Sequence, residues 1–410
     1  MRISNEDVYA YIFKKKGISN RVAKELCKLT ESFEEILQLD FNRIITDRFS
    51  FGVSDSEDDI SDILNNNKLC KLNNIVKDIV KNQNSLKEEA IGFYKSVESK
   101  GIFWTHITKE DYPRRLLNIP DPPMILYYRG KLPKENVPSV AIVGARECSI
   151  YGEKTACMFA RELSAAGIQI ISGGARGIDG LSQRSSLKVG GKSFSVLGCG
   201  VDVVYPKENE DLFEALIDKD GGLISEFEPG TKAITRNFPS RNRIISGLSD
   251  IVLVIEARKK SGTYITVCQA LEQGREVFAV PGRICDSLSD GCNNLISTGA
   301  GVALNPESVI NALLETGCMN AMFYSGDNKS LNTKDESFEV NDNNNSASGQ
   351  DLQSIIIHLL NKESYRISEI QENIKRKIST DELAVILVDM EADGIIKRVG
   401  NKYSSNFMNT

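Results

Sequence analysis

The stretch 139-SVAIVGARECSIYGEKTACMFARELSAAGIQIISGG-174 contains two short apolar runs separated by a helical pattern. Both runs are apolar at successive positions, which is typical of strands that are buried on both faces. A glycine follows each run directly, Gly144 after the first and Gly173 with Gly174 after the second. Buried strands that alternate with helices in this order predict a parallel sheet covered by helices.

The same alternation continues to about residue 318. Further apolar runs are KSFSVLG, GGLISEF, DIVLVIE and REVFAVPG, and the helical patterns between them include DGLSQRSSLKVGG and TYITVCQALEQG. We therefore expect residues 138–318 to form an α/β core, an extended Rossmann-like, doubly wound and mostly parallel sheet.

The sequences on either side of this core differ from it in composition and in the spacing of apolar residues. Residues 1–95 are charged and Asn-rich, with apolar residues at spacings of three and four, and predict a small helical domain that is SAM-like or helix-hairpin-helix-like. Residues 96–137 contain prolines that favour an extended lead-in to the core. The polar tract 319–350 predicts a disordered linker. Residues 351–405 show three helical patterns and a short two-stranded ending, which predict a winged-helix domain.

The third of these helical patterns, TDELAVILVDMEADG at 380–394, holds five acidic residues and no Lys or Arg. A helix that reads bases in the major groove lies between phosphates on both sides and normally carries basic or amide side chains. The winged-helix domain is therefore not expected to read a DNA sequence.

The composition excludes several classes of function. The 410 residues carry nine cysteines with no CxxC pair, which predicts a reduced, cytoplasmic chain without disulfides or a structural metal. No segment has the apolar length of a signal peptide or a membrane span. The two histidines, His106 and His358, lie in different predicted domains, so the core holds neither a histidine metal site nor a Ser-His-Asp triad. No cofactor is expected.

Glycines and basic residues recur at the predicted carboxyl ends of the strands, where an open parallel sheet binds its ligands. The glycines let the backbone approach a phosphate, and the helix N-termini that follow favour an anion. Because the net charge is −6, a polyanion site must be local. The basic residues that would form a short positive track are Arg146, Arg176, Lys207, Arg241 and Arg243.

Three acidic residues near strand ends, Asp179, Glu226 and Glu256, could act as acid–base pairs. The alternative is structural: a charge at a helix N-terminus for Asp179, and salt bridges to the cleft arginines for the other two. An NAD-dependent oxidoreductase is disfavoured, because no acidic residue stands clearly at the end of the second strand to bind a ribose.

A series of motifs over residues 104–304 resembles the DNA-processing protein A family, DprA, also called Smf. In order they are VGAR with SxYG, SGGARGID, YPKEN, SEF, FPSRNRIISGLSD, VIEA with SGTYIT, REVFAVPG and SDGCNNLISTGA. The resemblance implies an extended Rossmann fold that is not an enzyme. It also implies that the protein binds single-stranded DNA without strong sequence preference, protects it, forms a homodimer and helps to load the RecA recombinase during natural transformation.

The resemblance also implies which residues bind DNA. By motif, Arg146 and Lys207 contact single-stranded DNA and the FxxRNR segment supplies four further residues. Ser182 and Gln183 stand where the family commonly has an Ala-His pair, so that histidine has no counterpart. With the glycine loops, the expected DNA-binding residues are Gly144, Arg146, Gly173, Gly174, Arg176, Lys207, Phe238, Arg241, Asn242, Arg243, Ser261, Gly262 and Thr263. A homodimer is expected through Leu295, Ile296, Val302 and Leu304, and the alternative is that these residues only cap the sheet.

A related alternative is a nucleotide-binding or nucleotide-hydrolysing enzyme of the lysine-decarboxylase-like group, which has a similar Rossmann variant. The GGxGTxxE signature of those enzymes ends in a glutamate that performs the chemistry. The nearest counterpart in this chain is SGTYIT, with Thr266 in place of the glutamate. Hydrolysis of a nucleotide is therefore disfavoured.

Overall fold

The chain divides into two compact units, Met1–Ser330 and Leu331–Thr410. Within them, the computed structural model describes residues 3–30, 32–39, 66–318, 356, 360, 365–373, 383, 386–387, 390–391, 396–399 and 402–405. The predicted linker at 319–350 lies outside the described residues. Among the helices that are described, none combines the length and the apolar character needed to cross a bilayer.

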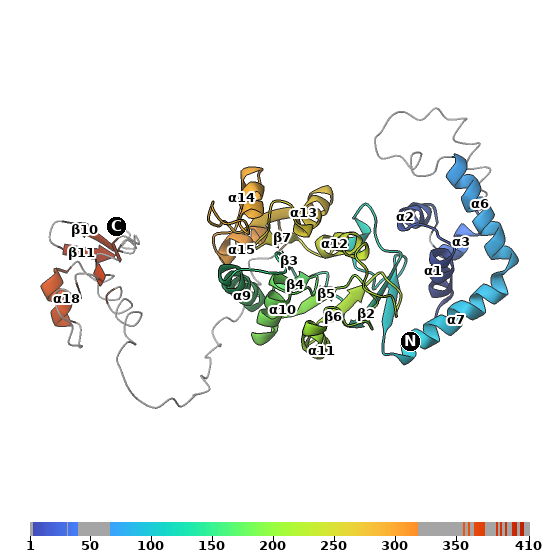
Figure 1. The fold of residues 1–410 in the computed structure, drawn as a ribbon, viewed down its shortest axis with the longest axis horizontal. Coiled ribbons are helices and arrows are strands. Elements are labelled where there is room, and N and C mark those ends of the chain that lie inside the picture. The colour runs from blue at the N-terminus through green and yellow to red at the C-terminus, as the bar shows by residue number, and fades with distance from the viewer. Residues whose placement is uncertain are drawn as a thin grey trace. The chain divides into compact units, whose positions relative to one another are not determined.

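A nine-stranded sheet forms the centre of the first unit (Figure 1). Its strand order is β1-β2-β6-β5-β4-β3-β7-β8-β9, in which β2 runs antiparallel to both neighbours and all the other pairs are parallel. The strands are β1 (Phe103–His106), β2 (Ile125–Gly130), β3 (Ser139–Val143), β4 (Gln169–Ser172), β5 (Ser193–Val196), β6 (Gly222–Ser225), β7 (Ile251–Val254), β8 (Glu276–Ala279) and β9 (Gly301–Val302).

The strand order confirms the predicted doubly wound, mostly parallel sheet. From β3 the chain winds through β4 and β5 to β6, and it then returns to the other side of β3 for β7, β8 and β9. All five residues of β3 are buried. Val140 and Ile142 belong to one hydrophobic cluster, and Ala141 and Val143 belong to another. Successive side chains point to opposite faces, so a continuous apolar run contributes to both clusters.

Buried side chains of the surrounding helices belong to both hydrophobic clusters. The cluster that holds Val140 and Ile142 also contains buried residues of α9, α10 and α15, and the cluster that holds Ala141 and Val143 contains residues of α11, α12, α13 and α14. The helices of the sheet region are α8 (Arg114–Leu117), α9 (Ile150–Ala165), α10 (Ile178–Lys188), the 3₁₀ turn η1 (Lys207–Asn209), α11 (Glu210–Asp218), α12 (Asn237–Gly247), α13 (Gly262–Glu272), α14 (Asp290–Ser297) and α15 (Pro306–Glu315).

The N-terminal residues that the structure describes are helical and share a core with the sheet. Buried side chains of α1, such as Ile12 and Phe13, belong to the same hydrophobic cluster as Trp104 of β1. The boundary proposed near residue 95 stays a prediction, because both sides of it fall in one compact unit. The helices are α1 (Asn5–Lys15), α2 (Asn20–Leu29), α3 (Phe33–Ile36), α6 (Asn66–Lys81) and α7 (Gln83–Ser99).

The second unit contains α18 (Ile367–Asn373) and an antiparallel pair of strands, β10 (Ile396–Val399) and β11 (Lys402–Ser405). Tyr403 of β11 is bridged to Tyr365, and it packs in a small apolar cluster with residues such as Leu387 and Met390. The two-stranded ending expected from the sequence is present. The winged-helix assignment of the whole unit stays a prediction.

Candidate nucleic-acid interface

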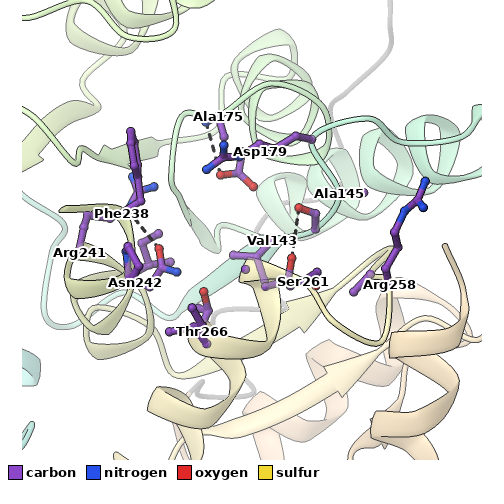
Figure 2. A pocket seen from close by; sticks show the side chains of 18 of the residues that line it. Val143, Ala145, Ala175, Asp179, Phe238, Arg241, Asn242, Arg258, Ser261 and Thr266 are labelled. Carbon is purple, nitrogen blue, oxygen red and sulfur yellow. Dashed lines mark hydrogen bonds between the residues drawn. The ribbon is translucent and has the colours of Figure 1, made fainter. Parts of the chain in front are cut away.

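A cleft of about 770 Å³ opens where the sheet reverses its winding direction, at the carboxyl ends of β3 and β7. The two strands are neighbours, but the chain leaves them toward opposite sides of the sheet, so a crevice forms between the two loops. Residues 143–147 at the end of β3 line one side of it. Another side is lined by residues that follow β7, namely Ala257, Arg258, Ser261, Gly262, Thr263, Ile265 and Thr266. Side chains of α12 complete the lining, and Figure 2 shows them around the cavity.

A close backbone contact holds the loop after β3 against the loop after β4. The backbone N–H of Ile178 donates to the carbonyl oxygen of Ala145 at 3.1 Å. Gly177, just before it, has a φ of 71°, and a Cβ at this position would lie 2.3 Å from the same oxygen. Glycine is therefore required, since it accepts a positive φ and leaves room for the carbonyl group. The contact brings Arg146 beside the glycine loop.

The first turn of α12 places an aromatic ring between two arginines. The guanidinium carbon of Arg146 lies 5.5 Å from the ring centre of Phe238, and that of Arg241 lies 5.8 Å from it. The ring of Tyr205 is 5.5 Å from the same ring, centre to centre, and is tilted by 42°. Tyr205 is 45% exposed and Phe238 is half-buried, so the arrangement places aromatic rings beside positive charge, which is the combination that suits a base and its phosphate.

Arg241 contributes a buried positive charge to this wall. Its Nη1 donates to the carbonyl oxygen of Gly173 at 2.8 Å and also to that of Val196. Burial lowers the pKa of Arg241 to about 10, so the guanidinium keeps its charge at neutral pH. The side chain thus fixes the glycine loop after β4 and supplies a positive potential below the cleft surface.

The three carboxylates considered as acid–base groups have structural partners. Asp179 accepts from the N–H groups of Gly173 at 3.1 Å and Ala175 at 3.4 Å, and burial raises the pKa of its carboxyl group. Glu256 accepts from the N–H and hydroxyl of Ser149, the residue that caps α9. Glu226 is bound by an arginine, as described below. These contacts support the structural alternative, although Glu256 pairs with a helix N-terminus and not with an arginine.

The N-terminus of α13 faces the cleft. Its N-cap residue Ser261 makes no capping hydrogen bond, and the buried Ser261 Oγ has no partner among the described residues. The hydroxyl of Thr263 donates to the carbonyl oxygen of Gly144 at 3.4 Å and joins α13 to the loop after β3. Thr266 also lines the cleft, so the position of the hydrolase glutamate carries a neutral hydroxyl here. A helix N-terminus next to arginines favours an anion.

The DNA recombination-mediator protein A family model matches residues 103–314, which include every element around the cleft. The chain belongs to this family. The DNA processing protein DprA of Streptococcus pneumoniae is 43% identical over 204 residues, which cover 50% of this chain and 72% of that relative. Protein Smf of Escherichia coli is 41% identical over 227 residues, 53% of this chain and 60% of the relative.

The fold is also similar to that of a solved relative. The X-ray structure of DprA from Streptococcus pneumoniae aligns with a TM-score of 0.56 and 33% sequence identity, covering 76% of this chain and 98% of that one. The extended Rossmann-like fold expected from the sequence is thereby confirmed.

Most of the residues predicted to bind DNA meet at the cleft. Gly144, Arg146 and α12 residues line it together with the start of α13, and a small pocket next to it is lined by Gly173 and Arg176 as well as by Arg146 and Phe238. Gly174 is not among the lining residues. Lys207 lies on the exposed turn η1, and its chain neighbours Tyr205 and Pro206 line the adjoining pocket. The predicted residues that line one or both cavities are Gly144, Arg146, Gly173, Arg176, Phe238, Arg241, Asn242, Ser261, Gly262 and Thr263.

Arg243 lies outside the lining of both cavities, which fits the alternative that one of the two arginines makes a salt bridge to Glu226. Its two terminal nitrogens each lie 2.7 Å from a carboxylate oxygen of Glu226, and its Nε lies 3.0 Å from the carboxylate of Asp121. These contacts satisfy the guanidinium, and the side chain is buried. Arg243 therefore holds α12 to Glu226 and Asp121 on the side of the helix away from the cleft. We do not include it among the DNA-binding residues.

The four residues predicted to form a dimer interface do not share one environment. Leu295 is buried in the core, and Ile296 packs against the same cluster. Val302 on the edge strand β9 is 41% exposed and Leu304 is 72% exposed. Leu295 is therefore unavailable to a partner, because the helix α14 turns it inward onto the sheet.

Arg258 was missed as a site residue from the sequence, whereas the sequence already favours Tyr205 and Phe238 as aromatic residues on which bases could stack. Arg258 lines the cleft directly after β7, and Tyr205 faces Phe238. Arg258 begins the run Arg-Lys-Lys between a buried strand and the SGT motif, so its position at a strand end was the available signal. Tyr205 lies far from Phe238 in the sequence, and its place beside that ring depends on the fold.

Proposed function

We propose that this chain binds single-stranded DNA in the cleft without sequence preference. The observation that carries the proposal is the wall in which Phe238 lies between Arg146 and Arg241, with Tyr205 beside it. Aromatic rings can stack on any base, because every base has a π-face, and the arginines can bind the adjoining phosphates. Membership of a recombination-mediator family supports the same function.

The same geometry favours a single strand over a duplex. In a duplex the faces of the bases are covered by their neighbours, so they cannot reach Phe238 or Tyr205 without unstacking. An unpaired strand exposes these faces and can enter a cleft. The net charge of the chain is −6, so attraction must come from the local arginines and the N-terminus of α13.

The proposal is tested by fluorescence anisotropy titrations of labelled single- and double-stranded oligonucleotides over a series of salt concentrations. We expect tighter binding of the single strand. Arg146→Ala should lower the slope of log K against log salt concentration by about 0.7, the value for one lost phosphate contact to a single strand. The matched control is Arg161→Ala, an exposed arginine of α9 that does not line the cleft.

Equal affinity of the wild type for both forms of DNA would contradict the preference for single strands. If Arg146→Ala has the same slope of log K against log salt concentration as the wild type and as Arg161→Ala, Arg146 makes no phosphate contact.

We further propose that the bound strand is protected and passed to the RecA recombinase during natural transformation. The support is the description of the family as a recombination mediator. The test is the ssDNA-dependent ATPase activity of RecA on strands coated with single-strand-binding protein. Wild-type chain should shorten the lag before ATP hydrolysis, and Arg146→Ala should shorten it less. No effect of the wild-type chain would contradict the proposal.

We also propose that the chain forms a homodimer through the end of the sheet. Leu304 and Val302 are exposed apolar side chains at the edge strand β9, where a second copy could cover them. Leu304→Lys should convert a dimer mass into a monomer mass in sedimentation at micromolar concentration. Leu271→Lys, at an exposed apolar position on α13, is the control that should keep the wild-type mass. A monomeric wild type would exclude the proposal.

A further inference from the structure

The cleft continues into a second basic region on the side across from Phe238 and Arg241 (Figure 2). Arg258 lines the cleft itself, and Lys259 and Lys260 follow it in the loop between β7 and α13. Arg283 lies in the loop between β8 and α14. These four exposed side chains are called the basic rim, and none of them forms an ion pair with a residue that the structure describes.

Hydrogen bonds join the segments that carry the basic rim. The backbone N–H of Ala257 donates to the carbonyl oxygen of Leu288 at 2.8 Å, and that of Gly291 donates to Ala257 at 2.8 Å. Leu288 lines the cleft together with Arg258. Figure 2 shows the Arg258 side chain on its own side of the cavity, across from Phe238 and Arg241. The loops after β7 and β8 therefore form one continuous border of the cleft.

Exposed apolar groups accompany this charge. Ile284 is 88% exposed and Ile150 is 75% exposed. Tyr151 is half-exposed, and its hydroxyl donates to the carbonyl oxygen of Pro281 at 2.9 Å, in the same loop as Arg283. This hydrogen bond fixes the orientation of the ring. A fixed aromatic face beside unpaired cations is suited to a stacked base followed by phosphates.

The acidic residues of these two loops are Glu256 and Asp286, and Asp290 follows at the start of α14. Glu256 is buried and accepts hydrogen bonds from Ser149. Asp286 accepts a hydrogen bond from the backbone of Leu288, and Asp290 lies in the first turn of α14. The basic side chains outnumber them, so the border keeps a positive potential. On a chain whose net charge is −6, such a local excess would attract a polyanion leaving the cleft.

We propose that the basic rim and the ring of Tyr151 form an extension of the single-stranded DNA path beyond the cleft. In this arrangement the cleft holds one part of the strand between Phe238 and the N-terminus of α13. The strand then passes over the β7–α13 loop, with its phosphates on the basic rim and a base on Tyr151. The inference rests on the proposed function, and it adds a second contact region with its own residues.

The test compares a short and a long oligothymidylate on the full-length chain. A strand of about 5 nucleotides should fill the cleft alone, and one of about 15 should also cover the basic rim. The variant is Lys259→Ala/Lys260→Ala/Arg283→Ala, which leaves Arg258 in the cleft intact. We expect the slope of log K against log salt concentration to fall by about 2 for the long strand, and affinity for the short strand to stay within about twofold.

The matched control is Lys81→Ala/Lys95→Ala/Lys188→Ala, which removes the same charge from exposed positions on α6, α7 and α10. The proposed extension of the DNA path would be overturned if the variant and the control lose the same affinity for the long strand. It would also be overturned if the slope of log K against log salt concentration for the long strand does not change in the variant. A loss that is as large for the short strand would also overturn it, because the basic rim would then belong to the cleft. If the wild type binds neither strand, the proposed function itself fails, and this result is distinct from the others.

Tyr151 provides a second readout. Tyr151→Ala should weaken binding of the long strand, while Tyr151→Phe, which keeps the ring, should retain at least half of the affinity. Near-UV circular dichroism and thermal unfolding check that both variants fold. If Tyr151→Ala binds the long strand as tightly as the wild type does, the stacking contact is excluded.

Discussion

Arg241 and Arg243 lie two residues apart on α12 and have different roles. In an α-helix successive residues are turned by about 100°, so side chains two positions apart point to nearly opposite sides. Arg241 lines the cleft and binds the carbonyl oxygen of Gly173. Arg243 points away from the cleft and forms a bidentate pair with Glu226. The RNR motif therefore combines one cleft residue with one structural brace.

The brace is expected to matter for stability. Arg243→Ala leaves the largely buried carboxylate of Glu226, whose side chain is 13% exposed, without this ion-pair partner. Removal of one partner of a buried ion pair costs about 3 kcal/mol. Urea denaturation should show this loss in the free energy of unfolding. Arg176→Ala is the control, because its guanidinium is exposed and lies 3.8 Å from an exposed carboxylate, and it should cost less than about 0.5 kcal/mol.

One outcome would assign Arg243 to the DNA-binding surface instead. If Arg243→Ala is as stable as Arg176→Ala and its DNA binding loses salt dependence, the guanidinium contacts phosphate in solution.

At the scale of elements, Asp7 joins the first helix to the edge strand of the sheet. It completes the capping box of α1 with Ser4, and it accepts a hydrogen bond from Trp104 Nε1 of β1 at 2.8 Å. Lys109 Nζ lies 2.8 Å from the same carboxylate, and His106 Nε2 lies 3.3 Å from it. Burial alone would raise the pKa of Asp7, but the hydrogen bonds from His106, Lys109 and Ser4 outweigh it and hold the pKa well below its usual range.

This depressed pKa predicts a loss of stability in acid. In the unfolded chain Asp7 takes up a proton as the pH falls through about 4, whereas in the folded chain it stays ionised to lower pH. The stability that Asp7 contributes is therefore complete above that pH and declines below it, by at most about 1.4 kcal/mol per pH unit. Asp7→Asn should have a lower free energy of unfolding than the wild type at pH 7. Its free energy of unfolding should then fall less steeply than that of the wild type as the pH drops below about 4.

The measurement is the free energy of unfolding in urea between pH 2 and pH 7, with Asp218→Asn as the control at an exposed position of α11. An acid decline in Asp7→Asn as steep as that of the wild type would show that other carboxylates account for it.

At the scale of the whole molecule, the cleft is built entirely from the unit Met1–Ser330. The other unit carries the acidic pattern at 380–394, which would be repelled by a phosphate backbone. We therefore expect a truncation after residue 330 to bind single-stranded DNA within about twofold of the full chain, since every residue that lines the cleft is retained. Anisotropy titration of both forms, checked for equal oligomeric mass, measures this. A large loss in a folded truncation would place part of the DNA surface in the second unit.

The architecture of the core and the edge of the sheet at which the cleft lies could be predicted from the amino-acid sequence. Apolar runs such as SVAIV and IVLVI have no polar face, so they are stable only between two layers of helices. Because parallel strands end at one edge of the sheet, the glycines and Arg146 that follow them could be placed together without a structure. The order of the motifs was sufficient to identify the family. These predictions use only the types and the order of residues that are close together in the chain, and the sequence gives both directly.

Residues of the same type take different roles in the folded chain, and the sequence could not assign these roles. Arg241 and Arg243 are indistinguishable as letters, and their roles separate because Gly173 lies on one side of α12 and Glu226 on the other. Leu295 and Leu304 are equally apolar, yet one packs on the sheet and the other faces solvent. In each case burial and charge pairing are set by partners that are remote in the sequence, and only the folded chain brings those partners into contact.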